Sequence, residues 1–107
     1  MVHMSTPGAV RVPKSRFKPR AFEYFRLVAQ TRQVFANMHA VLAAAGCGFD
    51  DVVKVTVFLT DIDDRPLINP VRQEMFGATR PASTLVEVPR LAVDGAKVEI
   101  ECVALVS

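Results

Sequence analysis

Two segments of the chain alternate apolar and other side chains, as strands with one covered face do. In VVKVTVFLT, residues 52–60, the apolar side consists of Val53, Val55, Val57 and Leu59. In KVEIECVALV, residues 97–106, it consists of Val98, Ile100, Cys102, Ala104 and Val106. This period of two residues predicts β-strands, and a third strand is expected over residues 83–88. Other parts of the chain must therefore cover the apolar face of the sheet.

Two helices are predicted for this role. Apolar side chains recur at spacings of three and four in the first of them: Val34, Phe35, Met38, Val41, Leu42 and Ala45. The spacing predicts an amphipathic helix from residue 28 that ends at a glycine cap, since Gly46 and Gly48 follow its last apolar position. A shorter helix is expected to begin at Asn69 as its N-cap, with Pro70 in its first turn, and to end at Phe76. The order helix, strand, helix, strand, strand predicts an α+β fold with both helices on one face of the sheet.

The composition excludes several classes of protein. With 107 residues, of which 50% are hydrophobic and 22% charged, the chain has the size and balance of one globular domain. It contains no apolar run of membrane-spanning length and no leader-like start, so we expect no membrane partner and a cytoplasmic location. Cys47 and Cys102 lack metal-ligand spacing, and the only imidazoles belong to His3 and His39, so no metal site is expected. Both cysteines are interpreted as small buried hydrophobic residues.

Charge is distributed unevenly along the chain. Residues 1–27 carry six basic groups and one acidic group, a net charge of +5, whereas residues 28–107 carry seven and ten, a net charge of −3. We therefore expect a basic N-terminal arm over residues 1–27 and a folded core over residues 28–107. Within the arm, AVRV and AFEYFRL are each candidates for an extra strand, and AFEYFRL is alternatively an extension of the first helix. Such an arm either attracts phosphate or lies solvated or loosely docked.

The face of the sheet left open by the helices is predicted to be mixed. Its polar members are Lys54, Thr56, Glu87, Glu99 and Glu101, and its apolar members are Phe58, Leu85, Val103 and Leu105. A mixed surface of this size is unusual on a monomer. We therefore expect copies of the chain to pack against one another there, in a cyclic assembly.

Five blocks in order carry a resemblance to a known family: QTRQVFANMHAVLAAAG, DDVVKVTVFLTDIDD, NPVRQEMF, RPASTLVEVPRL and KVEIECVAL. Together they resemble the Rid family, the reactive-intermediate deaminases also called the YjgF or endoribonuclease L-PSP family. The resemblance implies a chorismate-mutase-like α+β subunit with a mixed sheet, assembled as a homotrimer with three small-molecule pockets at the subunit interfaces. Active members hydrolyse enamines and imines to 2-keto acids and ammonia, and they require neither a metal nor an organic cofactor.

The chain departs from the family at the position of the pocket arginine. Active members have Pro-Ala-Arg-Ser where this chain has Pro81, Ala82 and Ser83, and the resemblance implies that the arginine grips the substrate carboxylate. Loss of such a contact costs about 2 to 5 kcal/mol of binding free energy. The change predicts weak or absent hydrolysis of 2-imino acids. Leu85 stands where many relatives keep a small polar residue or cysteine, and it makes the predicted pocket more apolar.

Three further residues are candidates for the site. Asn69 matches the asparagine that opens the family's second helix, so it is either a pocket residue or only an N-cap. Glu99 matches the first glutamate of the family's VEIE motif, which implies that it orders the attacking water; the alternative is an ordinary surface or interface carboxylate. Arg80, three residues before Ser83, is either a replacement cation or an ordinary surface arginine.

Three functions remain open at this point. The first is a Rid-type trimer that binds a small metabolite and has little or no deaminase activity. The second is a deaminase of a non-standard imine or enamine, in which Glu99 positions water. The third function is RNA binding or cleavage through the basic arm, which is disfavoured because no aromatic stacking platform accompanies the charge. The family's usual N-terminal hairpin, with its Gly-Pro-Tyr-Ser and Ser-Gly-Gln segments, has no counterpart in residues 1–27, and the sequence does not identify the ligand.

Overall fold

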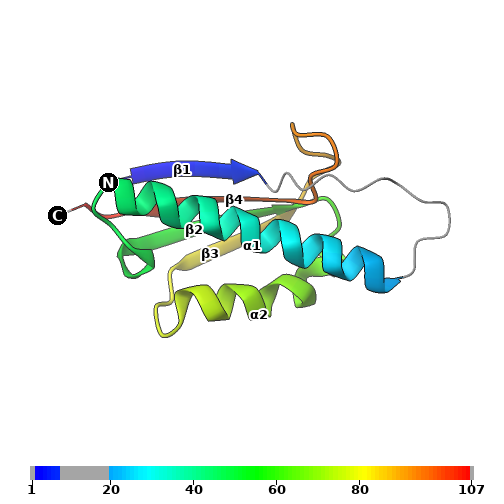
Figure 1. Ribbon diagram of the computed structural model, residues 1–107, viewed down its shortest axis with the longest axis horizontal. Helices are drawn as coiled ribbons and strands as arrows, with labels where there is room; N and C mark the ends of the chain where they lie inside the picture. Colours follow the sequence, from blue (N-terminus) through cyan, green and yellow to red (C-terminus); the bar gives the residue numbers. More distant parts are fainter. Residues whose placement is uncertain (1, 8–19, 107) are drawn as a thin grey trace.

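The computed structural model describes residues 2–7 and 20–106. It has an α+β fold, as predicted, with the strands in one mixed sheet of order β1-β4-β2-β3 (Figure 1). The strands are β1 (Val2–Pro7), β2 (Val52–Leu59), β3 (Ala82–Glu87) and β4 (Val98–Ala104), and the α-helices are α1 (Arg20–Ala44) and α2 (Arg65–Phe76). Two 3-10 turns, η1 (Phe49–Asp51) and η2 (Ile62–Asp64), precede β2 and α2. Strands β2 and β3 are parallel, whereas β4 is antiparallel to both of its neighbours.

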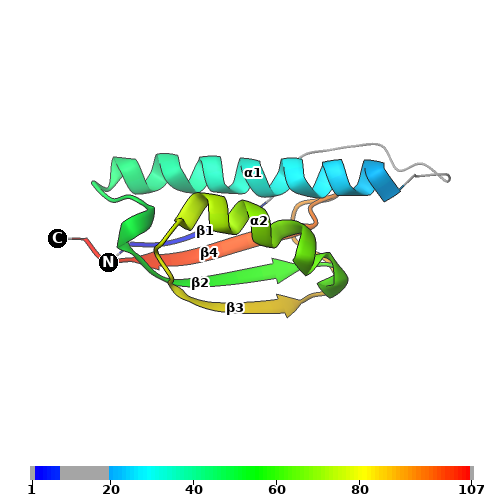
Figure 2. The same cartoon turned by 90° about the horizontal axis from the view of Figure 1, so that it is seen from below.

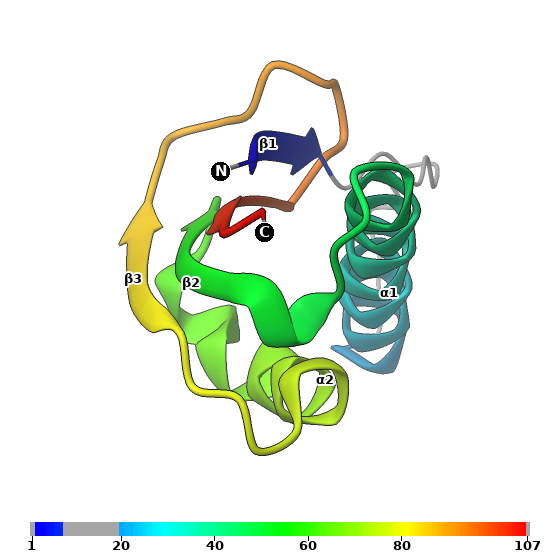
Figure 3. The same cartoon turned by 90° about the vertical axis from the view of Figure 1, so that its left-hand side faces the viewer.

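Both helices lie on the same face of the sheet (Figures 2 and 3). Helix α1 contacts α2, β1 and β4. The core between the two layers includes Val34, Phe35, Met38 and Leu42 of α1, Ile68, Val71 and Phe76 of α2, and alternate residues of β2 and β4. Val41, which the sequence placed on the inner stripe of α1, is instead 47% exposed. No helix among the described residues is long and apolar enough to cross a membrane.

Helix α1 begins eight residues earlier than predicted. It includes AFEYFRL, so the helical interpretation of that segment is correct and the strand interpretation is wrong. The other candidate strand, AVRV, lies outside the described residues. Strand β1, also in the arm, was not predicted. The predicted boundary between the arm and the core, at residue 27, falls inside α1. The division of the chain into an arm and a core stays a prediction.

The glycine cap of α1 is confirmed. Gly46 has φ of +76°, a conformation that glycine adopts at no steric cost. The Cys47 amide donates to the Leu42 carbonyl at 2.8 Å, and the Gly46 amide donates to the Ala43 carbonyl at 3.0 Å. This pair of hydrogen bonds is a Schellman motif, which satisfies carbonyls at the helix end.

Strand β2 contains an irregularity that the alternating pattern did not reveal. Its register against β4 shifts between Val52 and Lys54, so Val53 is the extra residue of a bulge. Val52 is buried and Val53 is 42% exposed, which contradicts the prediction that Val53 faces the core. From Val55 onward the predicted alternation holds.

Helix α2 begins at Arg65, with Pro66 in its first turn, and Asn69 lies inside the helix rather than at its N-cap. The N-cap interpretation of Asn69 is therefore wrong. The turn η2 ends at Asp64, directly before the helix. The Asp61 side chain caps this turn, because it accepts a hydrogen bond from the Asp63 amide at 3.0 Å. A proline fits at Pro66 because the first turn needs no amide donor, whereas Pro70 gives up one hydrogen bond within the helix.

The parallel pairing of β3 with β2 corrects the predicted faces of β3. Ser83 lies opposite Val55, Leu85 opposite Val57 and Glu87 opposite Leu59, and all three partners in β2 are buried. Leu85 and Glu87 therefore belong to the helix-covered face and not to the open one, and Leu85 packs against the core. The open face is lined by Lys54, Thr56 and Phe58 of β2, Thr84 and Val86 of β3, and Glu99, Glu101 and Val103 of β4.

The loop between β3 and β4 is held against α1. The fully buried Gln30 side chain donates to the Gly95 carbonyl at 3.0 Å and accepts from the Lys97 amide at 2.7 Å. Arg26 donates to the same Gly95 carbonyl at 3.0 Å. The start of β4 is therefore fixed by polar contacts with α1 as well as by strand pairing.

Candidate functional site

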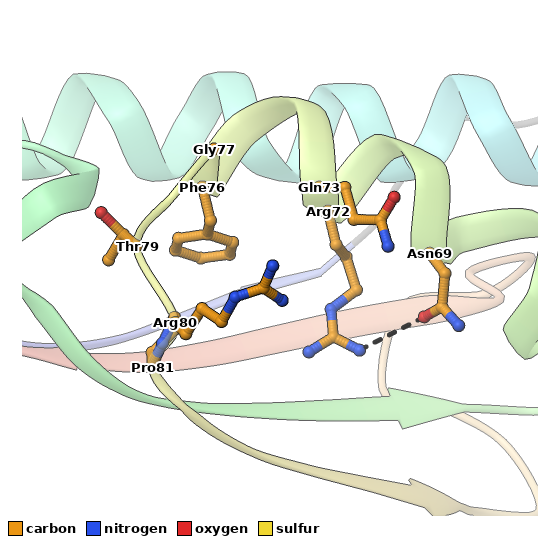
Figure 4. A pocket seen from close by; sticks show the side chains of 8 residues that line it. All are labelled: Asn69, Arg72, Gln73, Phe76, Gly77, Thr79, Arg80 and Pro81. Carbon is orange, nitrogen blue, oxygen red and sulfur yellow. Dashed lines mark hydrogen bonds between the residues drawn. The ribbon is translucent and has the colours of Figure 1, made fainter.

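A cavity of about 370 Å³ opens between α2 and the segment that leads into β3 (Figure 4). Its lining residues are Asn69, Arg72, Gln73, Phe76, Gly77, Thr79, Arg80 and Pro81. Two of these side chains are cationic and none is acidic. The cavity is therefore suited to an anionic small molecule.

Arg72 is the central cation of this cavity. It is partly buried, and its side chain extends from α2 toward β3. One terminal nitrogen donates a hydrogen bond to the Ser83 hydroxyl, and the other donates to the Asn69 side-chain oxygen at 3.5 Å. The Nε atom is buried and makes no hydrogen bond with any described residue.

Desolvation by burial lowers the pKa of Arg72 from its ordinary value. An arginine begins so far above neutrality that the group stays protonated at pH 7. Among the described residues, no carboxylate forms an ion pair with Arg72. The nearest acid on its helix, Glu74, pairs instead with Arg32 of α1 at 3.0 Å.

Arg80 approaches the cavity from the segment before β3. Its side chain is exposed, and Figure 4 shows it running beneath Phe76 toward Arg72. The cavity therefore receives one guanidinium from the helix and a second from the connection to β3.

Within the chain the candidate residues are brought together only in part. Asn69 and Arg80 line the cavity, and Ser83 joins it through Arg72. Leu85 packs against the core and does not line the cavity. Glu99 lies opposite Phe58 on the open face of the sheet, on the other side of the strands from Ser83.

The match to a protein-family model decides the family. The model described as endoribonuclease L-PSP matches residues 22–106, most of the chain. This chain belongs to the Rid family. The predicted membership is therefore confirmed, and the match begins within α1.

Individual relatives agree with this assignment. The chain is 49% identical over 75 residues to a RutC family protein of Pyrococcus horikoshii, a match that covers 70% of this chain and 59% of the relative. It is 39% identical over 79 residues to the 2-iminobutanoate/2-iminopropanoate deaminase of Capra hircus, with 74% and 57% covered. The chain thus spans less than two thirds of the length of these curated relatives.

A solved structure supports the Rid fold as well. The crystal structure of RidA from an Antarctic Psychrobacter species is 41% identical, with a TM-score of 0.68. The match covers 71% of this chain and 61% of that one.

Arg72 is the site residue that sequence reasoning missed in this Rid protein. The signal was present, because Arg72 follows Asn69 by three residues and residues at that spacing share one side of a helix. Its importance depends on β3 passing close to α2, since that passage brings Arg72 to the Ser83 hydroxyl. The sequence of α2 alone does not reveal this contact.

No group of three or more metal-ligating side chains lies together within residues 2–7 and 20–106. His39 is exposed on α1, and its ring stacks on Phe49 with 5.7 Å between centroids. His39 lies outside the cavity lining, so its imidazole is not part of the candidate Rid site.

Proposed function

We propose that this Rid protein forms a homotrimer that binds a small metabolite in the cavity between α2 and β3. The observation that carries the proposal is the cavity lining, with two arginines and no acidic side chain. Strand β3 is an edge strand, so the cavity lies beside an open margin of the sheet, where a neighbouring subunit has access. The family resemblance supplies the expectation of three interface pockets.

The open face of the sheet supports association. Phe58, Val86 and Val103 lie there among polar residues, and none of the three is covered by a helix. Glu99 shares this face, so it reaches a cavity of the kind described only if that cavity belongs to another subunit. Association through the sheet therefore brings together two halves of a site that one chain holds apart.

Two measurements test this proposal. Sedimentation equilibrium is expected to give three times the chain mass of 11.7 kDa, and a stable monomer at micromolar concentration would contradict the trimer. Isothermal titration with 2-oxobutanoate, a 2-keto acid of the type that active relatives release, is expected to show saturable binding. A trimer that binds no 2-keto acid would contradict the assigned ligand site.

Hydrolysis of 2-imino acids is the second candidate function. The sequence predicts weak activity because Ser83 replaces the family arginine, but the guanidinium of Arg72 beside Ser83 favours a test of activity. In this reaction water adds to the imine carbon, the C–N bond breaks, and the products are a 2-keto acid and ammonia. In our proposal Glu99 of one subunit holds that water against substrate in a neighbouring cavity.

The reaction is tested with 2-iminobutanoate generated by a threonine dehydratase, in the presence and absence of the protein. Glu99→Gln is expected to reduce the rate at least about 100-fold, because loss of a positioned acid or base has an effect of that order. Glu101→Gln is the matched control, since it lies on the same strand and face. Equal losses in the two variants would contradict the role of Glu99.

The remaining expectations stay predictions. The RNA hypothesis depends on the basic arm, most of whose charged residues lie outside the described residues. The cytoplasmic location and the absence of a cofactor are likewise expectations from the sequence and the resemblance.

A further inference from the structure

Arg72 is a half-buried cation that forms no ion pair with a carboxylate among the described residues. Taking a guanidinium out of water costs free energy unless an anion or a full set of hydrogen bonds compensates it. Arg72 donates one hydrogen bond to Ser83 and one to Asn69, and both accepting oxygens are neutral. Its Nε atom has no partner among the described residues. A negatively charged group in the cavity would therefore offset the partial burial of this guanidinium.

The hydrogen bonds of Arg72 also leave donors available in a defined place. A guanidinium carries five N–H groups, two on each terminal nitrogen and one on Nε. One terminal nitrogen donates to Ser83 and the other to Asn69, so each retains one N–H. Two donors are the number that a carboxylate takes from arginine when it binds as a bidentate pair.

We infer that Arg72 is the carboxylate-binding residue of this protein and that Ser83 and Asn69 are positioning residues that orient its guanidinium. The inference rests on the proposed function and assigns the carboxylate of its ligand to one of the two cations in the cavity. In this chain the cation comes from α2 to the place where the resemblance implies a cation from β3. Ser83 stands where the resemblance implies an arginine, and its hydroxyl accepts a hydrogen bond from Arg72.

The test compares a charged probe with a neutral one of nearly the same shape. Binding of 2-oxobutanoate and of its methyl ester is measured by isothermal titration in the wild-type protein, Arg72→Gln and Arg65→Gln. The wild type is expected to bind the acid at least tenfold more tightly than the ester. Arg72→Gln is expected to weaken acid binding about 30-fold or more and to leave ester binding unchanged, because only the charge-assisted pair is lost. Arg65 is exposed on the same helix and lies outside the cavity lining, so Arg65→Gln is expected to match the wild type.

Further variants separate a direct role from a structural one. Arg72→Lys keeps the charge and loses the fork, so it is expected to retain a preference for the acid that is smaller than that of the wild type; this variant decides the matter if Arg72→Gln does not fold. Ser83→Ala is expected to reduce the acid-to-ester preference, and Ser83→Thr to retain it. A purely structural role of Ser83 would change both affinities together, which would contradict the positioning role.

The outcomes distinguish this inference from the proposed function. Equal wild-type affinities for acid and ester, or unchanged acid binding in Arg72→Gln, overturn the assignment of Arg72 and leave the metabolite site standing. Binding of neither probe by the wild-type trimer overturns the metabolite site and the carboxylate assignment together.

Discussion

The guanidinium of Arg72 on α2 donates a hydrogen bond to the hydroxyl of Ser83 on β3. The two residues are eleven positions apart in the chain and belong to different layers of the fold. A position where the family resemblance implies an arginine therefore lies in direct contact with an arginine from elsewhere in this chain.

This contact predicts that positions 72 and 83 depend on one another. In an Arg72→Gln background, Ser83→Arg is expected to restore 2-oxobutanoate binding at least tenfold, because it returns a cation to the cavity. In the wild-type background the same change is expected to have a smaller effect, since Arg72 already supplies that cation. Titration calorimetry of the four proteins measures the coupling. An identical factor in both backgrounds would show that the two positions act independently.

The Gln30 side chain is expected to contribute strongly to stability. It is fully buried and bridges the Gly95 carbonyl and the Lys97 amide, so Gln30→Ala leaves two polar groups of the loop without that partner. The free energy of unfolding is expected to fall by about 2 to 4 kcal/mol in urea denaturation. Gln33→Ala, an exposed change on the same helix, is the control and is expected to lower it by less than about 0.5 kcal/mol. Similar losses in both variants would contradict the bridging role.

Gly95 is expected to resist substitution more than another glycine of the chain. It has φ of +82°, and an added Cβ atom would lie 3.1 Å from the Arg26 guanidinium. Gly95→Ala is therefore expected to lower the free energy of unfolding by about 1 to 2 kcal/mol. Gly48, with φ of −132° and no atom within 4 Å of an added Cβ, is the matched site, and Gly48→Ala is expected to be neutral or slightly stabilising. Thermal unfolding of both variants tests the difference, and equal shifts would contradict it.

Periodicity predicted which elements form, because alternation in β2 and β4 and the three-to-four spacing in α1 are local properties of the sequence. It did not reveal the bulge at Val53, since one inserted residue reverses the face of its neighbours without changing their apolar character. The start of α2 was wrong for a related reason. Asn69 followed by Pro70 is a typical helix start, but Pro66 and the η2 turn place the start at Arg65.

The site was harder to predict than the fold. Asn69 was named from the family resemblance and Arg80 from its position three residues before Ser83, and both line the cavity. The face of Leu85, in contrast, depends on the parallel register between β2 and β3. The contact of Arg72 with Ser83 depends on how α2 and β3 are placed relative to one another. Long-range pairing decides both features, and neither local spacing nor composition contains it.

Cys102 is expected to make the protein less stable at alkaline pH. It is buried in the core, and desolvation raises the pKa of its thiol above the ordinary value. As the pH rises past about 8.5, the thiol ionises in the unfolded chain and stays protonated in the folded one, so the unfolded state binds fewer protons. At neutral pH this thiol is protonated in both states, so it does not change the free energy of unfolding. Above about pH 8.5 it lowers the free energy of unfolding by up to about 1.4 kcal/mol per pH unit. Cys102→Ala is expected to flatten this decline in urea denaturation between pH 7 and 10, at a cost of about 1 kcal/mol at neutral pH. A decline in Cys102→Ala as steep as that of the wild type would show that Cys102 is not the source.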